Sequence, residues 1–193
     1  MWTISFHDGT LVVKGGDLER LPPGFRMDDR IGHPRGPAWT YPQVVTAARA
    51  FGIPYTDDAQ IYTRLTGLAP CTAREPRTYQ REAVDAWHRA GRRGAVLLPT
   101  GSGKTFVAEL AMLETERATL VVAPTLDLVG QWHDRLKTAF GRTIGMLGGG
   151  QHDVQDITVS TYDSAAIHMG RYGNRFGLVI FDEVHHLGAP GYR

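Results

Sequence analysis

The sequence predicts an α/β fold in which helices flank a parallel sheet, with a small α+β domain in front of it. From about residue 94 onward, short and continuously apolar runs alternate with segments of helical periodicity. Such runs are typical of strands covered on both faces, and their alternation with helices predicts parallel strands joined by right-handed crossovers. The first 70 residues lack this alternation. We therefore expect two domains, one over residues 1–70 and one over residues 71–193.

The N-terminal domain is expected to contain a hairpin and one helix. The stretch TISFHDGTLVVK alternates around Asp8 and Gly9, which is a strong signal for a hairpin turn. The stretch YPQVVTAARAFG predicts a helix that ends at its final glycine. Residues 15–38 hold many glycines and prolines and are expected to be loop-rich, and a linker is expected near residues 56–76. Seven basic and seven acidic side chains make this domain electrically neutral.

The second domain is expected to open with a helix over residues 78–90, TYQREAVDAWHRA. The stretches KTFVAELAMLETE and LDLVGQWHDRLKTAF place apolar side chains at helical spacing and predict two further helices. Three consecutive glycines at residues 148–150 predict a flexible loop. The apolar runs predict strands at residues 94–99, 119–124, 143–147, 156–161 and 177–182.

The composition narrows the class of protein. With 42% hydrophobic residues, the chain can bury a real core. A formal net charge of +1 gives no global polycation, so any nucleic-acid binding must come from local placement of charge. Cys71 is the only cysteine, which rules out an intrachain disulfide and favours a reducing compartment. The apolar runs are too short to span a membrane and the N-terminus lacks a signal-peptide pattern, so we expect a soluble intracellular protein without membrane partners.

The stretch LPTGSGKT follows the first apolar run and opens a helix, which is the context that phosphate binding requires. Backbone N–H groups there surround an anion, and the helix N-terminus adds its dipole. Gly101 and Gly103 permit a close approach of the backbone. Lys104 is expected to reach the β- and γ-phosphates of a nucleotide, and the Thr105 hydroxyl is expected to bind Mg²⁺. The strict pattern has glycine where Leu98 stands, so the alternative is a glycine-rich turn that only caps a structural helix.

Two adjacent acids follow the last apolar run. Asp182 ends the strand and is expected to hold Mg²⁺ through water, while Glu183 acts as the base or orienter of an attacking water. A solvated strand end is the alternative. Neither His185 nor His186 has the spacing of a zinc ligand. We expect His185 to couple the nucleotide site to another domain and His186 to pack or to face water.

Polar residues near three helix starts are further candidates. Gln80 is expected to hydrogen-bond an adenine edge, and an exposed helical glutamine without a role is the alternative. Thr125 and Thr161 each follow a strand, where hydroxyl and N–H groups bind backbone phosphates without reading bases; helix capping is the alternative for Thr125. The predicted nucleotide-binding residues are Arg77, Gln80, Thr100, Gly101, Ser102, Gly103, Lys104 and Thr105.

Together these stretches resemble the first RecA-like lobe of superfamily 2 helicases, a P-loop NTPase lobe. LPTGSGKT is similar to motif I, APTLDLVGQW to motif Ia, VSTYDSA to the next strand-contacting motif and FDEVHH to motif II. Taken with RTYQREAV, they are especially similar to XPB-type helicases in their compact archaeal form, over about residues 77–188. In that family motif I often carries the leucine found at position 98. The opening hairpin DGTLVVKGG more weakly resembles the damage-recognition domain in front of the archaeal XPB core.

The resemblance implies ATP-dependent unwinding or translocation on double-stranded DNA, in repair or transcription-linked opening, with ATP and Mg²⁺ as cofactors. It implies a cytoplasmic, nucleoid-associated protein in a prokaryote or a nuclear protein in a eukaryote. The implied roles are phosphate binding by Lys104, Mg²⁺ binding by Thr105 and Asp182, activation of water by Glu183, and contact with the DNA backbone by Thr125 and Thr161.

The family pattern continues with a Ser/Thr-Ala-Thr segment and a second RecA-like lobe that carries an arginine finger, and these 193 residues contain neither. We therefore expect the chain alone to hydrolyse ATP barely or not at all, and not to unwind DNA. Expected partners are the second lobe and either a nuclease or a repair or transcription protein. The alternatives are a restriction-type superfamily 2 translocase and a non-catalytic DNA- or protein-binding module. Residues 1–76 hold no convincing nuclease-like cluster, which argues against the first alternative.

Overall fold

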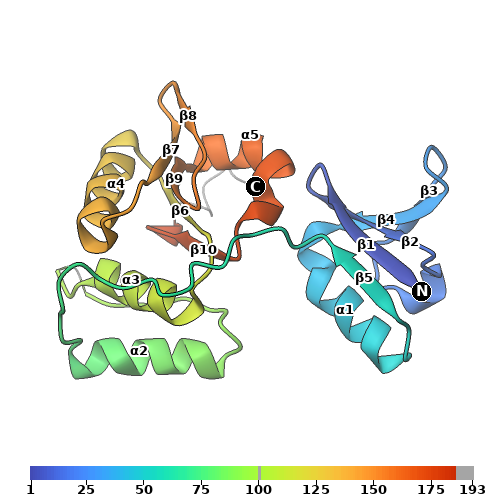
Figure 1. The fold of residues 1–193 in the computed structure, drawn as a ribbon, viewed down its shortest axis with the longest axis horizontal. Helices are drawn as coiled ribbons and strands as arrows, with labels where there is room; N and C mark the ends of the chain where they lie inside the picture. Colours follow the sequence, from blue (N-terminus) through green and yellow to red (C-terminus); the bar gives the residue numbers. More distant parts are fainter. Residues whose placement is uncertain (100, 186–193) are drawn as a thin grey trace. The chain divides into compact units, whose positions relative to one another are not determined.

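The structure is a computed structural model that describes residues 1–99 and 101–185. The chain forms two compact units (Figure 1). The first unit comprises Met1–Tyr62 and Asp163–Gly177, and the second comprises Thr63–Tyr162 and the residues from Leu178 onward. The chain thus leaves the second unit and returns to it, which a single boundary at residue 70 does not describe. Among the described residues, no helix has the length and apolar character needed to cross a lipid bilayer.

The first unit contains a five-stranded sheet in the order β3-β4-β2-β1-β5. Its strands are antiparallel, except that β1 and β5 pair in parallel. Its core includes Trp2, Ile4 and Val13 of the sheet and Val44 of the helix, all almost completely buried. The elements are β1 (Trp2–His7), β2 (Thr10–Lys14), η1 (Leu18–Arg20), β3 (Arg26–Asp28), β4 (His33–Pro37), η2 (Ala38–Thr40), α1 (Tyr41–Ala50) and β5 (Tyr55–Asp58).

The hairpin predicted for the first unit is confirmed, and its loop-rich region is partly wrong. Asp8 and Gly9 form the turn between β1 and β2 with φ angles of 45° and 74°. Strands β3 and β4 lie within the region expected to be loop-rich. β4 reads HPRGP, which has low strand propensity. Its Gly36 permits a close approach, because a Cβ there would lie 2.5 Å from the ring of Phe25.

The second unit contains a five-stranded sheet in the order β10-β6-β9-β7-β8. The first four strands are parallel, which confirms the predicted α/β class, and β8 is antiparallel to β7. Helix α4 packs against β6, β7 and β9, and α3 packs against β10. The elements of the second unit are α2 (Thr78–Arg89), α3 (Lys104–Thr115), β6 (Thr119–Ala123), α4 (Leu126–Phe140), β7 (Gly145–Gly148), β8 (Gln151–Asp153), β9 (Ile157–Thr161) and β10 (Leu178–Phe181). Between β9 and β10 the chain forms α5 (Tyr162–Tyr172) and η3 (Gly173–Arg175), which apart from Tyr162 belong to the first unit.

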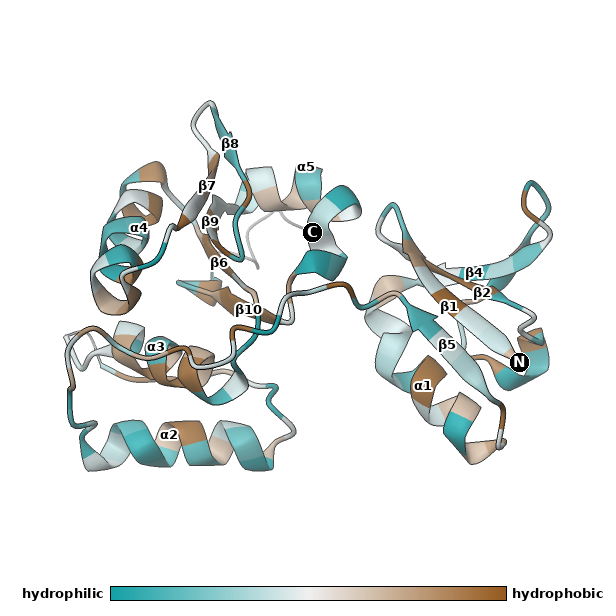
Figure 2. Cartoon of the chain, viewed as in Figure 1, coloured by the Kyte–Doolittle hydropathy of each residue, from teal (hydrophilic) through white to brown (hydrophobic). Residues whose placement is uncertain are grey.

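The core of the second unit follows the apolar pattern of its sequence. β6 is buried along its whole length, as a strand covered on both faces should be. Helix α4 buries Val129, Trp132, Leu136 and Phe140, which recur at helical spacing on one face. Figure 2 shows hydrophobic residues along β6 and β10, whereas α2 is mostly hydrophilic. The sheet edge that carries β10 is therefore held by apolar packing on α3 and α4.

The expected linker near residues 56–76 is wrong for its middle part. Leu65 and Leu68 are buried in the core of the second unit. The backbone N–H of Leu65 donates to the carbonyl of Glu116 at 2.8 Å, and the N–H of Ala118 donates to the carbonyl of Thr63 at 2.9 Å. Full burial of one leucine stabilises a fold by about 1.5–3 kcal/mol. From Thr63 onward, this segment is thus part of the second unit.

Two further predictions for the second unit are wrong. Residues 94–99, all of which the structure describes, form no strand. β10 is the edge of the sheet, and its Val179 and Phe181 are 44% and 47% exposed. An apolar run indicates burial, but strand pairing also needs backbone partners that periodicity does not reveal. The glycines at residues 148–150 form the turn of the β7–β8 hairpin instead of a flexible loop. Strand β8 was not predicted because its sequence, QHD, is polar and exposed.

Candidate functional site

The glycine-rich loop is closed by its own backbone. The N–H and the hydroxyl of Ser102 both donate to the carbonyl of Pro99, at 3.3 and 2.6 Å. Gly103, the N-cap of α3, has a φ of 86°, in the left-handed region that favours glycine. A Cβ at this position would also lie 2.7 Å from Nε2 of Gln80. The left-handed backbone therefore favours glycine at Gly103, and a Cβ there would displace the end of the Gln80 side chain. Thr100 of the same loop lies outside the described residues.

The start of α2 holds the loop through side-chain hydrogen bonds. Nε2 of Gln80 and the hydroxyl of Tyr79 both donate to the carbonyl of Ser102, at 2.9 and 2.7 Å. Oε1 of Gln80 accepts the backbone N–H of Arg77 at 3.0 Å, and the Arg77 guanidinium donates to the Tyr79 hydroxyl at 3.1 Å. Gln80 is 5% exposed, so its amide fixes the loop in this structure. The adenine contact stays a prediction for Gln80.

Tyr79 is a functional contact that the sequence reasoning missed. Helical periodicity assigns its ring to the apolar face of α2, and nothing in the pattern signals that its hydroxyl reaches the loop. The hydroxyl is 23 residues away from its acceptor along the chain. Only the packing of α2 on α3 brings the two together.

Asp182 directly follows β10 and is held by three donors. Its Oδ1 accepts the backbone N–H of Glu183 at 3.0 Å, and its Oδ2 accepts the indole N–H of Trp132 at 2.7 Å. Its carbonyl oxygen accepts the hydroxyl of Tyr162 at 2.7 Å. Glu183 has a φ of 51°, a left-handed conformation that is rare outside glycine and clusters at functional sites. The two acids are thus in a fixed and partly strained backbone geometry.

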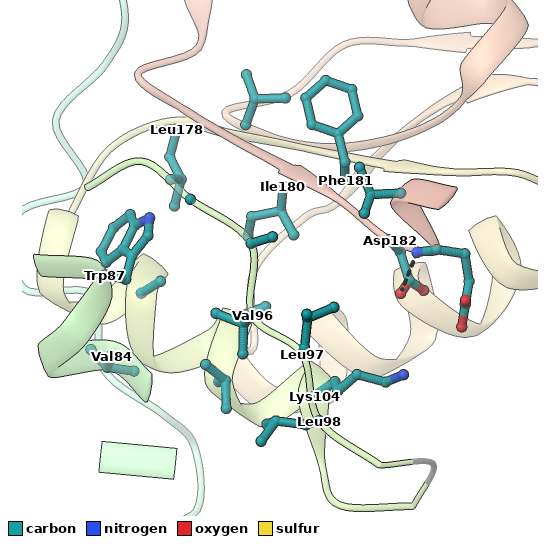
Figure 3. A pocket seen from close by; sticks show the side chains of 18 of the residues that line it. Val84, Trp87, Val96, Leu97, Leu98, Lys104, Leu178, Ile180, Phe181 and Asp182 are labelled. Carbon is teal, nitrogen blue, oxygen red and sulfur yellow. Dashed lines mark hydrogen bonds between the residues drawn. The ribbon is translucent and has the colours of Figure 1, made fainter. Parts of the chain in front are cut away.

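A cavity of about 580 Å³ connects the loop with the two acids (Figure 3). Lys104 at the start of α3 lines it together with Asp182 and Glu183 at the end of β10. Most of the remaining wall is apolar and comes from residues 94–99, α2, α3 and β10. The arrangement therefore places one cation and two carboxylates on the wall of a single cavity, which suits an anionic ligand bound with a divalent cation.

The donor set at this cavity fits Mg²⁺. The carboxylate of Asp182 lines the cavity, and half-buried Thr105 directly follows Lys104, which also lines it. Carboxylate and hydroxyl oxygens are both hard ligands. Each carboxylate oxygen of Asp182 accepts one protein donor, which leaves a lone pair for a metal or its water. Within residues 1–99 and 101–185, no three His, Cys, Asp or Glu residues gather into a metal-binding group. A cation here would thus need further oxygen atoms from its ligand and from water, which phosphates supply to Mg²⁺.

His185 lies next to the predicted base. Its Nδ1 is 3.4 Å from Oε2 of Glu183, and its side chain is 69% exposed. Ion pairs this exposed contribute little to stability. The contact therefore links the predicted coupling residue to Glu183 without fixing either side chain firmly; His186 lies outside the described residues.

Thr125 and Thr161 lie near the carboxyl ends of two neighbouring strands. Thr161 ends β9 and pairs in register with Ala123 of β6, two residues before Thr125. Thr125 is the N-cap of α4, because its hydroxyl accepts the N–H of Leu128 at 3.3 Å. The capping role left open for Thr125 is therefore present, and contact with DNA stays a prediction. β10 pairs with β6, and β6 pairs with β9. Asp182, Thr125 and Thr161, which end or follow these strands, therefore all lie at the carboxyl edge of the sheet, where parallel sheets bind ligands.

Two protein families match the sequence over separate ranges. Residues 73–193 match the family described as type III restriction enzyme, res subunit. Residues 4–59 match the family described as the xeroderma pigmentosum group B helicase damage recognition domain. The division into domains at residue 70 stays a prediction.

Individual relatives carry the same resemblance. The sequence is 48% identical over 118 residues to the DNA 3'-5' translocase XPB2 of Sulfurisphaera tokodaii, over 61% of this chain and 27% of the relative. It is 35% identical over 128 residues to the DNA 3'-5' helicase XPB of Mycobacterium tuberculosis, over 61% of this chain and 23% of the relative. The chain thus spans about a quarter of the length of these relatives. The predicted resemblance to XPB-type helicases is confirmed.

The fold also matches a solved structure. The UvsW helicase from bacteriophage T4 superposes with a TM-score of 0.53 over 99% of this chain and 85% of that chain, at 20% sequence identity. At this identity the match concerns the fold alone. It confirms the predicted RecA-like class of the parallel sheet.

Proposed function

We propose that this chain, which belongs to the family of the type III restriction enzyme res subunit, forms the first RecA-like lobe and the front domain of an XPB-type DNA helicase or translocase driven by ATP. The observation that carries the proposal is the shared cavity of Lys104, Asp182 and Glu183. These residues come from the two sequence motifs that resemble helicase motifs I and II. The division into a front domain of residues 1–70 and a lobe of residues 71–193 is part of this proposal.

The proposed chemistry is hydrolysis of the terminal phosphoryl group of ATP. Lys104 binds the phosphates together with the backbone of the loop, and Thr105 and Asp182 hold the metal ion. When bound, Mg²⁺ supplies positive charge to the phosphate oxygens. Glu183 accepts a proton from, or orients, the attacking water. The largely apolar wall of the cavity offers few competing polar groups near the reacting atoms.

The proposed DNA contacts lie at the carboxyl edge of the sheet. Thr125 and Thr161 offer hydroxyl and backbone groups near the ends of β6 and β9, and such groups bind phosphates without reading sequence. Full turnover also needs a cation from a second RecA-like lobe, because arginine fingers contribute about 10³–10⁵ in rate. The 193-residue chain alone is therefore proposed to bind nucleotide and double-stranded DNA with little or no hydrolysis.

The proposal extends to the front domain and to the cellular context. The match of residues 4–59 supports recognition of distorted duplex by this domain. It also favours an XPB-type enzyme over a restriction-type translocase. A repair protein, a transcription protein or a nuclease is proposed as a further partner, at DNA in the cytoplasm of a prokaryote or in a nucleus.

Nucleotide binding to the 193-residue chain tests the proposal. A fluorescent ATP analogue is titrated with and without Mg²⁺ into the wild type, Lys104→Ala and Asp182→Asn. Lys104→Ala should weaken binding at least about tenfold in both conditions, because a charge-assisted contact is lost. Asp182→Asn should remove most of the Mg²⁺ dependence while leaving Mg²⁺-free binding unchanged. Equal affinities for all three proteins would contradict the proposal.

DNA-stimulated hydrolysis separates this function from the non-catalytic alternative. The comparison is between the 193-residue chain alone and the same chain extended to include a second lobe. We expect duplex DNA to stimulate ATP turnover only in the extended protein. An extended protein that binds DNA without any ATP turnover would favour the non-catalytic alternative.

A further inference from the structure

We propose that Trp132 and Tyr162 are positioning residues that aim Asp182 at a bound metal–nucleotide and connect it to the strand ends that carry the predicted DNA contacts. This inference rests on the proposed function, because it assigns Asp182 to the metal. Both residues lie within stretches that resemble helicase motifs, APTLDLVGQW and VSTYDSA, and the predicted DNA contacts in those stretches are the threonines.

Trp132 fixes the carboxylate of Asp182 from helix α4. Its indole N–H is its only hydrogen-bonding group, and it donates to Oδ2 of Asp182 at 2.7 Å across 50 residues of sequence. The ring is 5% exposed and shares the buried face of α4 with Val129 and Leu136. A buried indole on a rigid helix has little freedom to turn away. The direction of the Asp182 carboxylate is therefore set by where α4 lies.

Tyr162, the first residue of α5, fixes the backbone of Asp182. It is 3% exposed, and its hydroxyl donates to the carbonyl of Asp182 at 2.7 Å. Its ring stacks on that of Phe181, with centroids 6.1 Å apart and an interplanar angle of 11°. Tyr162 directly follows Thr161 at the end of β9. Phe181, which ends β10, and Asp182, which follows it, are thus both contacted by Tyr162, the residue next to a predicted DNA contact.

Both positioning residues are linked to DNA-facing positions through short, rigid paths. Thr125 caps the helix that carries Trp132, and Thr161 precedes Tyr162 in the chain. A ligand that shifts either helix start would also shift a donor of Asp182. Duplex DNA and Mg²⁺–nucleotide should therefore change each other's affinity, and by the same factor, since coupling of binding free energies is reciprocal.

The variants Trp132→Phe and Tyr162→Phe test the proposal in the 193-residue chain. Each keeps an aromatic ring and removes one donor to Asp182. Each should raise the Mg²⁺ concentration for half-maximal binding of the fluorescent ATP analogue by about three- to tenfold, with Mg²⁺-free affinity unchanged. The matched control is Trp39→Phe, which removes an indole that is 71% exposed in the first unit and should leave the titration unchanged. Thermal melting of each variant shows whether it is folded.

An NMR measurement gives a second readout that does not depend on activity. The chain has four tryptophans, so its indole N–H spectrum is simple, and the peak of Trp132 is the one that Trp132→Phe removes. This peak should shift on addition of nucleotide with Mg²⁺, and much less with nucleotide and a chelator. A Trp132 peak that is identical in both conditions would overturn the inference.

The outcomes separate this inference from the function on which it rests. A wild type with Mg²⁺-dependent binding, and two folded variants that titrate as it does, would overturn the positioning role alone. A wild type that binds no nucleotide would overturn both. If Trp132→Phe does not fold, Tyr162→Phe decides, because it keeps the stack on Phe181 and loses only one hydroxyl. Loss of the reciprocal effect of duplex DNA in either variant would support the proposed coupling.

Discussion

The two sides of the candidate site are held in different ways. On the strand side, Asp182 continues the pairing of β10 with β6 and accepts hydrogen bonds from three residues. On the loop side, the residues before the glycine-rich turn form no strand, and Leu97 is 88% exposed. That loop depends on α2, through Gln80 and Tyr79. The proposed metal-binding side is thus part of the sheet, while the proposed phosphate-binding side is held by side chains of α2.

The two sides should therefore respond differently to mutation. Changes on the strand side should alter metal dependence with the loop intact, whereas changes on the loop side should alter nucleotide affinity with or without metal. A buried ion pair joins the two sides. Glu109 of α3 is 4% exposed and contacts Arg135 of α4 at 2.5 Å and Arg74 at 3.9 Å.

Removing the carboxylate of Glu109 should have the largest effect, a loss of unfolding free energy. Glu109→Ala leaves the guanidinium of Arg135 without its carboxylate, and removing one partner of a buried pair costs about 3–5 kcal/mol. Because Arg135 is itself 40% exposed, water compensates in part and we expect about 2–3 kcal/mol of lost unfolding free energy. Chemical denaturation measures it. Glu82→Ala on the exposed face of α2 is the control, and equal stabilities would show that the pair does not join the two helices.

Gly103→Ala should act next most strongly, and on the loop side only. The added Cβ meets Gln80 at 2.7 Å and forces a left-handed alanine, which costs about 1–2 kcal/mol before any clash. Nucleotide affinity with and without Mg²⁺ should fall about tenfold. Gly150→Ala is the matched control, since Gly150 has a φ of 85° with open space around it. If both variants bind alike, the approach of Gln80 does not matter.

Gln80→Ala should lower nucleotide affinity less than Gly103→Ala does. It removes the side-chain amide that donates to the carbonyls of Ser102 and Gly103 and accepts the N–H of Arg77. Because Arg77 is exposed, water can replace the lost acceptor, and a neutral hydrogen bond contributes about 0.5–1.5 kcal/mol. Nucleotide affinity and thermal stability should both fall. The exposed Gln131 of α4 provides the control variant Gln131→Ala. A Gln80 variant with normal stability and weaker adenine discrimination would instead support the predicted base contact.

Tyr79→Phe should give the smallest effect of the series. It removes one hydroxyl, while Gln80 still donates to the same carbonyl of Ser102. A neutral hydrogen bond contributes about 0.5–1.5 kcal/mol. A double-mutant cycle with Gln80→Ala measures whether the two contacts act together. A coupling of zero would mean that each holds the loop independently.

Local pattern predicted the elements that depend on few distant partners. Helix α4 follows from the spacing of Val129, Trp132, Leu136 and Phe140, and the first hairpin follows from Asp8 and Gly9. The motif residues Lys104 and Asp182 were recognisable because each lies in a short, characteristic sequence, at the start of α3 and directly after β10. The run at residues 94–99 was misjudged because its strand would need a backbone partner, and no periodicity specifies one.

The α/β alternation and the identity of the motif residues Lys104, Asp182 and Glu183 could be predicted from the sequence, because each depends on neighbours within a few positions. The hydrogen bonds from Trp132 and Tyr162 to Asp182, and from Gln80 to the loop, are visible only in the tertiary structure. These contacts span from 20 to 50 residues. They form because helices packed on a shared sheet bring the polar groups of distant residues into contact. The spacing of residues along the chain does not reveal such contacts.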